Sequence, residues 1–163
     1  MLLLLSLVTR HLSARRYHMK EGYFFVPKWP DQCCFFQSQP MERVFKILAV
    51  DNEPSVTTAL RFVFGGPRYE IICVGSGIEA LHHLDANSDR FDVIIVDQKM
   101  PKLTGVELVR EIRHRNVGGK IIVVSANLSS EVCEAYQQMD VNVMFSKPFD
   151  VNQLRSAVDR LAA

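Results

Sequence analysis

The stretch "DVIIVDQKMP", residues 92–101, places four consecutive β-branched residues directly before an aspartate, Asp97. An apolar run without polar alternation is typical of a strand covered on both faces, as in a parallel sheet. Four further short apolar runs accompany it along the chain, at residues 44–50, 69–74, 121–124 and 141–145. The sequence therefore predicts a five-stranded sheet in which this stretch supplies the third strand.

Helix signals alternate with the apolar runs. Prolines, capping boxes and capping side chains that begin helices occur at Pro54, Ser76, Thr104, Ser129 or Ser130, and Asp150. The fourth of these helices would carry Val132, Tyr136 and Met139. The alternation predicts an α/β fold of the (βα)5 type, a doubly wound parallel sheet in a three-layer α/β/α sandwich with right-handed crossovers.

The first forty residues lack this regular pattern. The opening apolar run is too short for a membrane helix, and no cationic segment precedes it as in a signal peptide. We expect residues 1–40 to be a disordered extension or a spurious start, with Met41 opening a domain over residues 41–163. A degenerate signal peptide is the weaker alternative. With no credible membrane span in the sequence, a cytoplasmic location is expected.

Composition excludes some partners and sites. The formal net charge of +1 argues against a dedicated polyanion binder, so neither nucleic acid nor a membrane surface is an expected partner. The four cysteines do not form a zinc-like or secreted-framework spacing. Cys73 and Cys133 are interpreted as small buried thiols of a reducing compartment.

Polar side chains follow four of the five predicted strands, at Asp51, Asp97, Ser125 and Lys147. In an open parallel sheet, ligands bind beyond the carboxyl ends of the strands, so these groups are expected at one edge. Together they suit phosphoryl transfer to a carboxylate. Asp97 offers a nucleophilic oxygen, Lys147 a fixed cation and Ser125 a hydrogen bond, and Mg²⁺ needs only one or two carboxylates beside phosphate oxygens.

Four motifs occur in order: "AVDNEP", "IIVDQKMPKLTG", "VVSA" and "SKPF". With them, residues 44–163 resemble the receiver domain of two-component response regulators. The resemblance implies a flavodoxin-like fold with strand order 2-1-3-4-5. It also implies a single-domain regulator, since no output domain follows the last predicted helix, acting through a protein partner or a phosphorelay.

The resemblance further assigns roles to individual residues. Asp97 would accept a phosphoryl group from a histidine on a sensor histidine kinase or histidine phosphotransfer protein. Ser125 and Ala126 would contact the phosphoryl group with Lys147, whose peptide bond to Pro148 would be cis. Magnesium would be bound by Asp51, Asn52, Asp97 and the backbone carbonyl of Lys99.

Two positions depart from the family pattern. Asn52 stands where a second acid normally ligates the metal, so binding should survive but require more magnesium. Glu53 could supply the missing charge, although strand alternation points it away from the side of Asp51's neighbour, Asn52. Met144 replaces the aromatic residue whose ring usually reports phosphorylation, and Phe145 should face the other layer.

These departures leave two alternatives open. The first is a pseudo-receiver, an interaction module that is not phosphorylated. The second and weaker alternative is a phosphatase similar to haloacid dehalogenases, with Asp51 and Glu53 as its pair of acids. The leading interpretation is not an enzyme, apart from self-catalysed phosphoryl uptake and hydrolysis on Asp97.

Overall fold

The computed structural model describes residues 43–87 and 91–162, so the prediction for residues 1–40 lies outside the described part. The described part contains five strands: β1 (Phe45–Val50), β2 (Tyr69–Val74), β3 (Val93–Asp97), β4 (Lys120–Ser125) and β5 (Val143–Ser146). Five helices alternate with them: α1 (Pro54–Val63), α2 (Gly77–Asn87), α3 (Gly105–His114), α4 (Ser130–Gln138) and α5 (Val151–Ala162). Within these residues, no helix combines the length and apolar character that a membrane crossing needs.

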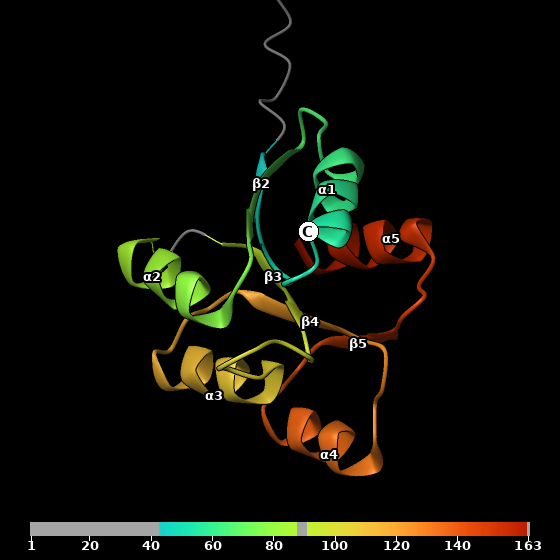
Figure 1. Cartoon of the computed structure of the whole chain (residues 1–163). Helices are drawn as coiled ribbons and strands as arrows, with labels where there is room; N and C mark the ends of the chain where they lie inside the picture. Colours follow the sequence, from blue (N-terminus) through green and yellow to red (C-terminus); the bar gives the residue numbers. More distant parts are fainter. Residues whose placement is uncertain (1–42, 88–90, 163) are drawn as a thin grey trace, which may run out of the picture. The chain divides into compact units, whose positions relative to one another are not determined.

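All five strands pair in parallel, in the order β2-β1-β3-β4-β5. Helices α1 and α5 cover one face of the sheet, whereas α2, α3 and α4 cover the other (Figure 1). This confirms the predicted doubly wound, flavodoxin-like sandwich. The order reverses at β1 and β3, which places the ends of these two strands beside the expected ligand site.

The central strands are buried on both faces, and their side chains alternate between two cores. One core lies under α2, α3 and α4, and the other lies under α1 and α5. In β3, Ile94 and Val96 enter the first core, while Val93 and Ile95 enter the second, and none exceeds 1% exposure. Burial on both sides explains why this strand has no polar residue before Asp97.

Of the two predicted capping boxes, the one at Thr104 has both of its hydrogen bonds and the one at Ser76 has only the first. Thr104 accepts a hydrogen bond from the Glu107 amide, and the Glu107 carboxylate accepts one from the Thr104 amide, which completes the box of α3. Ser76 likewise accepts from the amide of Glu79, but the Glu79 carboxylate bonds to the amide of Gly75 instead. The second box is therefore shifted by one residue, because the amide of Gly75 is also within reach of the Glu79 side chain.

Strand β5 is shorter at its start than the predicted run of residues 141–145. Asp140 adopts the left-handed conformation with φ 52°, and the Val141 amide donates to the Tyr136 carbonyl (3.2 Å). These features end α4 rather than begin a strand. Val141 therefore packs against the core from the helix end instead of joining the sheet.

Two apolar residues of α2 that differ in burial provide a test of the core. Leu84 is fully buried, whereas Ile78 is 46% exposed on the same helix. We expect Leu84→Ala to lower the free energy of unfolding by about 3 kcal/mol, because it leaves a cavity beneath the sheet. Ile78→Ala should change it by less than about 0.5 kcal/mol. Urea denaturation followed by circular dichroism measures both, and equal losses would contradict this account of the core.

Candidate functional site

Four side chains from different strands meet at the carboxyl edge of the sheet. Asp51 follows β1, Asp97 ends β3, Ser125 ends β4 and Lys147 follows β5. Backbone bonds extend the sheet ladder beyond the strands: the Asp51 amide donates to the Val74 carbonyl (3.1 Å), and the Lys147 amide donates to the Ser125 carbonyl (2.7 Å). The site residues therefore keep the spacing of the sheet, although two of them lie outside regular strands.

The Lys147 ammonium joins two buried carboxylates. Its Nζ lies 2.7 Å from Asp51 Oδ2 and 2.9 Å from Asp97 Oδ1. The two aspartates are 2% and 3% exposed, and the Lys147 side chain is 15% exposed. Two carboxylates that share one small buried space repel each other, and the cation between them offsets that repulsion.

Each aspartate uses its second oxygen in the same way. Asp51 Oδ1 accepts a hydrogen bond from the Glu53 amide (2.8 Å), and Asp97 Oδ2 accepts one from the Lys99 amide (3.0 Å). Bonds of this kind, reaching two residues ahead, turn the chain sharply after a strand. The turns hold both carboxylates with one oxygen toward Lys147.

The surroundings of Lys147 favour its charged form. Burial lowers the pKa of the ammonium, but the hydrogen bonds and charges of Asp51 and Asp97 outweigh this effect and raise the pKa above its usual value. The contribution of the charged form to stability is complete below the unfolded-state pKa. It is lost only as the pH rises through the raised pKa, so a cation is present in the site throughout the neutral range.

Ser125 lies in the site, but its hydroxyl faces the following loop. The residue is 1% exposed, and its Oγ donates to the Asn127 carbonyl (2.8 Å) and accepts from the Asn127 amide (3.1 Å). The neighbouring Ala126 is exposed. A contact between Ser125 and a group on Asp97 therefore requires the hydroxyl to exchange its partner.

The donors predicted for magnesium are all oxygen atoms: the carboxylates of Asp51 and Asp97, the Asn52 amide carbonyl and the Lys99 backbone carbonyl. Hard cations prefer such donors, and Mg²⁺ usually keeps waters and substrate phosphate oxygens in its shell. Among residues 43–87 and 91–162, no group of three or more His, Cys, Asp or Glu forms a cluster that could hold a metal. The residues present fit a Mg²⁺ ion whose binding relies partly on phosphate oxygens.

Glu53, two positions after Asp51, approaches the same lysine as Asp51 does. Its side chain is 59% exposed, and Oε1 lies 3.8 Å from Lys147 Nζ, at the rim of the site. β1 ends at Val50, the chain bends at Asn52, and Glu53 is the N-cap residue of α1. The Glu53 carboxylate therefore lies near the site without taking a buried place in it.

Met144 and Phe145 lie on opposite faces of β5, as alternation predicted. Met144 packs against the core under α2, α3 and α4, and Phe145 packs against the core under α1 and α5. Phe145 therefore does not supply the aromatic ring that position 144 lacks. The peptide bond between Lys147 and Pro148 is cis.

One pair beside the site was not predicted from the sequence. Gln98, which follows Asp97 directly, accepts a hydrogen bond from the Tyr136 hydroxyl on α4. Tyr136 is fully buried, and this burial, followed by the negative charge of Asp97, raises the pKa of its hydroxyl. The sequence indicated Tyr136 only as a helix residue, and nothing in its distance of 38 positions from Gln98 points to the bond.

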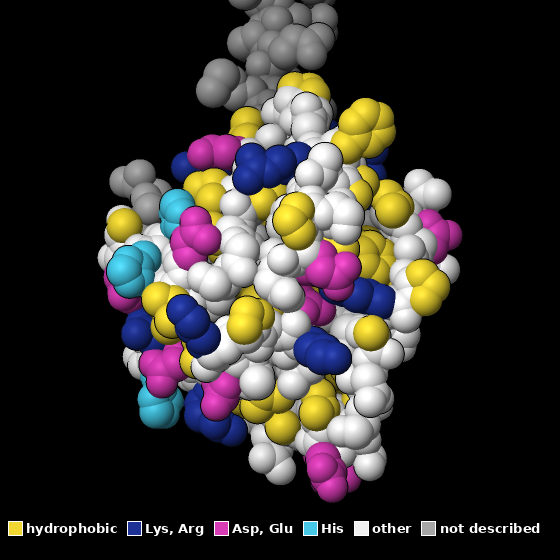
Figure 2. Space-filling view, viewed as in Figure 1, with side chains coloured by type: hydrophobic (Ala, Val, Ile, Leu, Met, Phe, Trp, Pro, Cys, Tyr) yellow, Lys and Arg dark blue, Asp and Glu magenta, His cyan; other side chains and the backbone are white. Residues whose placement is uncertain are grey.

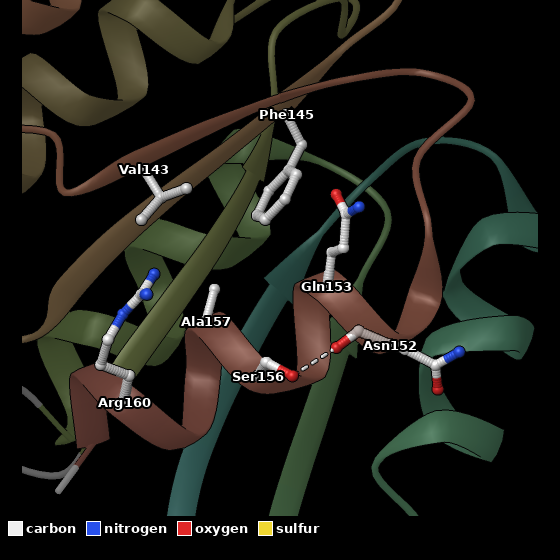
Figure 3. A pocket seen from close by; sticks show the side chains of 7 residues that line it. All are labelled: Val143, Phe145, Asn152, Gln153, Ser156, Ala157 and Arg160. Carbon is white, nitrogen blue, oxygen red and sulfur yellow. Dashed lines mark hydrogen bonds between the residues drawn. The ribbon is translucent and has the colours of Figure 1, made fainter.

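A second hollow, of about 440 Å³, lies along β5 and α5 and is distinct from the acidic site (Figure 3). Val143, Phe145 and Ala157 form its apolar part, and Arg160 is its one charged lining residue. The Ser156 hydroxyl is already bonded to the Asn152 carbonyl (2.8 Å). With neither an acid nor a histidine in its lining, this hollow has no group suited to accept a phosphoryl group.

Comparison with known proteins finds relatives of similar sequence. The sporulation initiation phosphotransferase F of Bacillus subtilis is 25% identical over 115 residues, which cover 71% of this chain and 91% of that protein. The alkaline phosphatase synthesis transcriptional regulatory protein PhoP of the same organism is 27% identical, and the match covers 69% of this chain but only 46% of PhoP. The chain thus spans nearly all of one relative and less than half of the other.

Several solved structures also resemble this chain in fold and sequence. The chemotaxis protein CheY4 of Vibrio cholerae is 28% identical, with a TM-score of 0.66, and the match covers 72% of this chain and 98% of that one. The receiver domain of the Francisella response regulator 1452 is 26% identical, with a TM-score of 0.66, over 72% and 95% of the two chains. The family described as "Response regulator receiver domain" matches residues 47–159. Because that match covers more than half of the sequence and the fold and site agree with it, the chain belongs to the response regulator receiver domain family.

Proposed function

We propose that Asp97 accepts a phosphoryl group from a phosphohistidine and that the protein then signals through contacts with another protein. The donor would be a sensor histidine kinase or a histidine phosphotransfer protein. The observation that carries the proposal is the Lys147 ammonium held at 2.7 Å and 2.9 Å from the carboxylates of Asp51 and Asp97. This arrangement supplies a nucleophile and a cation in one small site.

The reaction is the transfer of a phosphoryl group from a phosphohistidine to the free carboxylate of Asp97. The bond from phosphorus to the donor imidazole nitrogen breaks, and a bond from phosphorus to an Asp97 carboxylate oxygen forms. The electron pair remains on the imidazole, which takes up a proton. Lys147 then interacts with a phosphoryl oxygen while keeping its place near Asp51, and Ser125 Oγ exchanges the Asn127 carbonyl for another phosphoryl oxygen.

Magnesium belongs to this proposal as a cofactor. Asp51, Asp97, the Asn52 amide carbonyl and the Lys99 carbonyl would hold it, and it would neutralise charge on the transferring group. The donor set includes an amide where a carboxylate would add a negative charge. Affinity for the cation should therefore be lower than that of a site with three acids.

A protein partner suits the surface beside the site. An apolar cavity of about 350 Å³ adjoins Lys147 and is lined by α1 and the segment after β5, including Leu60, Val63, Pro148 and Phe149. On the face seen in Figure 2, Lys and Arg side chains are interspersed with Asp and Glu, which gives no broad basic surface for nucleic acid there. The free thiols of Cys73 and Cys133 are compatible with the cytoplasm as the place of action.

The relatives support transfer chemistry without making this protein a conventional enzyme. One of them is called a phosphotransferase, and others are named as transcriptional regulatory proteins. We propose that this chain transfers no group to a small substrate and catalyses only phosphoryl uptake and hydrolysis on its own Asp97. In this proposal the phosphoryl group reaches Asp97 within a two-component system or a phosphorelay.

The pseudo-receiver is the second candidate, and Asn52 is the observation that favours it. The phosphatase alternative is weaker, because its second acid would be Glu53. That side chain is 59% exposed and lies 3.8 Å from Lys147, at the rim of the site. An acid in this position lacks the burial that holds a catalytic proton donor near its partner.

Replacement of the acceptor tests the proposal directly. The wild-type protein incubated with acetyl phosphate and Mg²⁺ should gain the mass of one phosphoryl group, and Asp97→Asn should gain none because it lacks the nucleophile. Intact-protein mass spectrometry measures the gain. Asp85→Asn, which removes an exposed acid of α2, is the matched control and should behave as wild type. A folded wild-type protein that gains no mass would favour the pseudo-receiver.

Restoring the missing acid tests the magnesium site. We expect Asn52→Asp to lower the Mg²⁺ concentration for half-maximal phosphoryl uptake by about tenfold, because it adds a negative charge close to the ion. Asn152→Asp adds the same charge on α5 and should leave the midpoint unchanged. Titration of uptake against Mg²⁺ gives the midpoints. Equal midpoints for wild type and Asn52→Asp would show that position 52 does not contact the ion.

A further inference from the structure

Tyr136 is a buried polar residue next to the acceptor, and the transfer reaction gives it no task. It is fully buried on α4 and is the largest such side chain among the described residues. Its hydroxyl donates to Oε1 of Gln98, which follows Asp97 in the chain. A phenol hydroxyl deep in a core needs a hydrogen-bond partner, and here that partner belongs to the loop that carries the acceptor.

Gln98 connects this loop to a second helix as well. Its Oε1 also accepts a hydrogen bond from the Val106 amide (3.2 Å), and its backbone carbonyl accepts one from the Gly105 amide (3.0 Å). Both amides belong to the first turn of α3, which contacts α4 beneath the sheet (Figure 1). A single glutamine oxygen therefore links α3 and α4 one residue after Asp97.

The hydroxyl occupies space that only glycine leaves open. A β-carbon at position 105 would lie 2.5 Å from the Tyr136 hydroxyl oxygen and 2.6 Å from the Asp97 carbonyl oxygen. Real β-carbons do not approach other heavy atoms this closely, so Gly105 is required for the phenol to reach its partner. The contact between α4 and the acceptor loop is consequently tight. A small displacement of the loop therefore displaces α4, and a displacement of α4 displaces the loop.

The hydroxyl also lies within the electric field of the acceptor. Burial and then the negative charge of Asp97 raise the pKa of Tyr136. A phosphoryl group would increase the negative charge at Asp97, since a phosphorylated side chain carries about −1.5 to −2 at neutral pH and a carboxylate carries a single charge. The orientation of the O–H dipole, and with it the bond to Gln98, responds to such a change.

Position 144 on β5 carries no aromatic side chain. Methionine stands there in place of the aromatic residue expected on β5, and it packs against the same core as Tyr136. An aromatic side chain of this core that is bonded to the acceptor loop thus lies on α4 and not on β5. We propose that Tyr136, acting through Gln98, couples phosphorylation of Asp97 to a displacement of α4. This inference rests on the proposed function.

The test separates phosphoryl uptake from the response of α4. Tyr136→Phe keeps the ring and removes the hydroxyl, and Gln98→Met removes the acceptor at similar length. Tyr69→Phe is the matched control, because the Tyr69 hydroxyl also donates to a side-chain oxygen, here of the Asp159 carboxylate, but the residue packs in the other core. Uptake from acetyl phosphate with Mg²⁺ is measured by intact mass, and the response is measured by hydrogen exchange of the α4 peptide.

In wild type and in Tyr69→Phe, phosphorylation should change the exchange rate of α4. In Tyr136→Phe and in Gln98→Met, uptake should stay within about twofold of wild type, while the change in α4 exchange should fall by about threefold to tenfold. The double variant should lose no more of the α4 response than Gln98→Met alone, because Gln98→Met already removes the bond to Tyr136 together with the bond to the Val106 amide. The ¹⁵N shift of the Gln98 side-chain amide should respond to phosphorylation only when Tyr136 is present.

Three results would overturn the inference or its basis, and they can be told apart. Normal uptake with an undiminished α4 response in both variants would remove Tyr136 from the coupling. A loss equal in Tyr69→Phe would assign the effect to general loosening of the core. If Tyr136→Phe fails to fold, the α4 response of Gln98→Met decides the question in its place. A wild-type protein that takes up no phosphoryl group would refute the proposed function itself.

Discussion

The contact of one ammonium group with two buried carboxylates is the interaction on which the site depends. Lys147 reaches Asp51 and Asp97 from the far end of the chain and closes the carboxyl edge of the sheet. Without a cation there, two acids that are almost fully buried would repel each other in a medium of low dielectric. The parallel sheet brings the acids together, and the lysine makes their proximity tolerable. Structure and chemistry thus use the same three residues.

The sheet itself was predictable because its signals are local and mutually consistent. The β-branched run before Asp97 indicated a strand with two buried faces, and the structure gives β3 that environment. Capping residues such as Thr104 and Ser129 marked where helices begin, since their side chains bond to amides three residues ahead. Polar residues at strand ends then indicated the edge at which the site would form.

Features that depend on side-chain direction beyond the strands were not predictable in the same way. The distance of 3.8 Å between Glu53 and Lys147 arises beyond the end of β1, where the chain bends before α1. Ser125 bonds to its own loop rather than to Asp97. The bond between Tyr136 and Gln98 joins elements that are distant in sequence, so only the packed fold reveals it. Sequence patterns report local periodicity, whereas these contacts depend on tertiary packing.

The space left by Gly105 also limits how this sequence can vary. A β-carbon there would collide with the Tyr136 hydroxyl and also with the backbone of Asp97 and Gln98, so a change at position 136 alone makes no room for a larger residue at 105. A smaller residue at 136 would in turn open a void beneath α4 and leave the Gln98 side chain without its phenolic donor. Position 105 is therefore restricted to glycine by the backbone around it, whereas positions 136 and 98 depend on each other, and natural variants should change these two together.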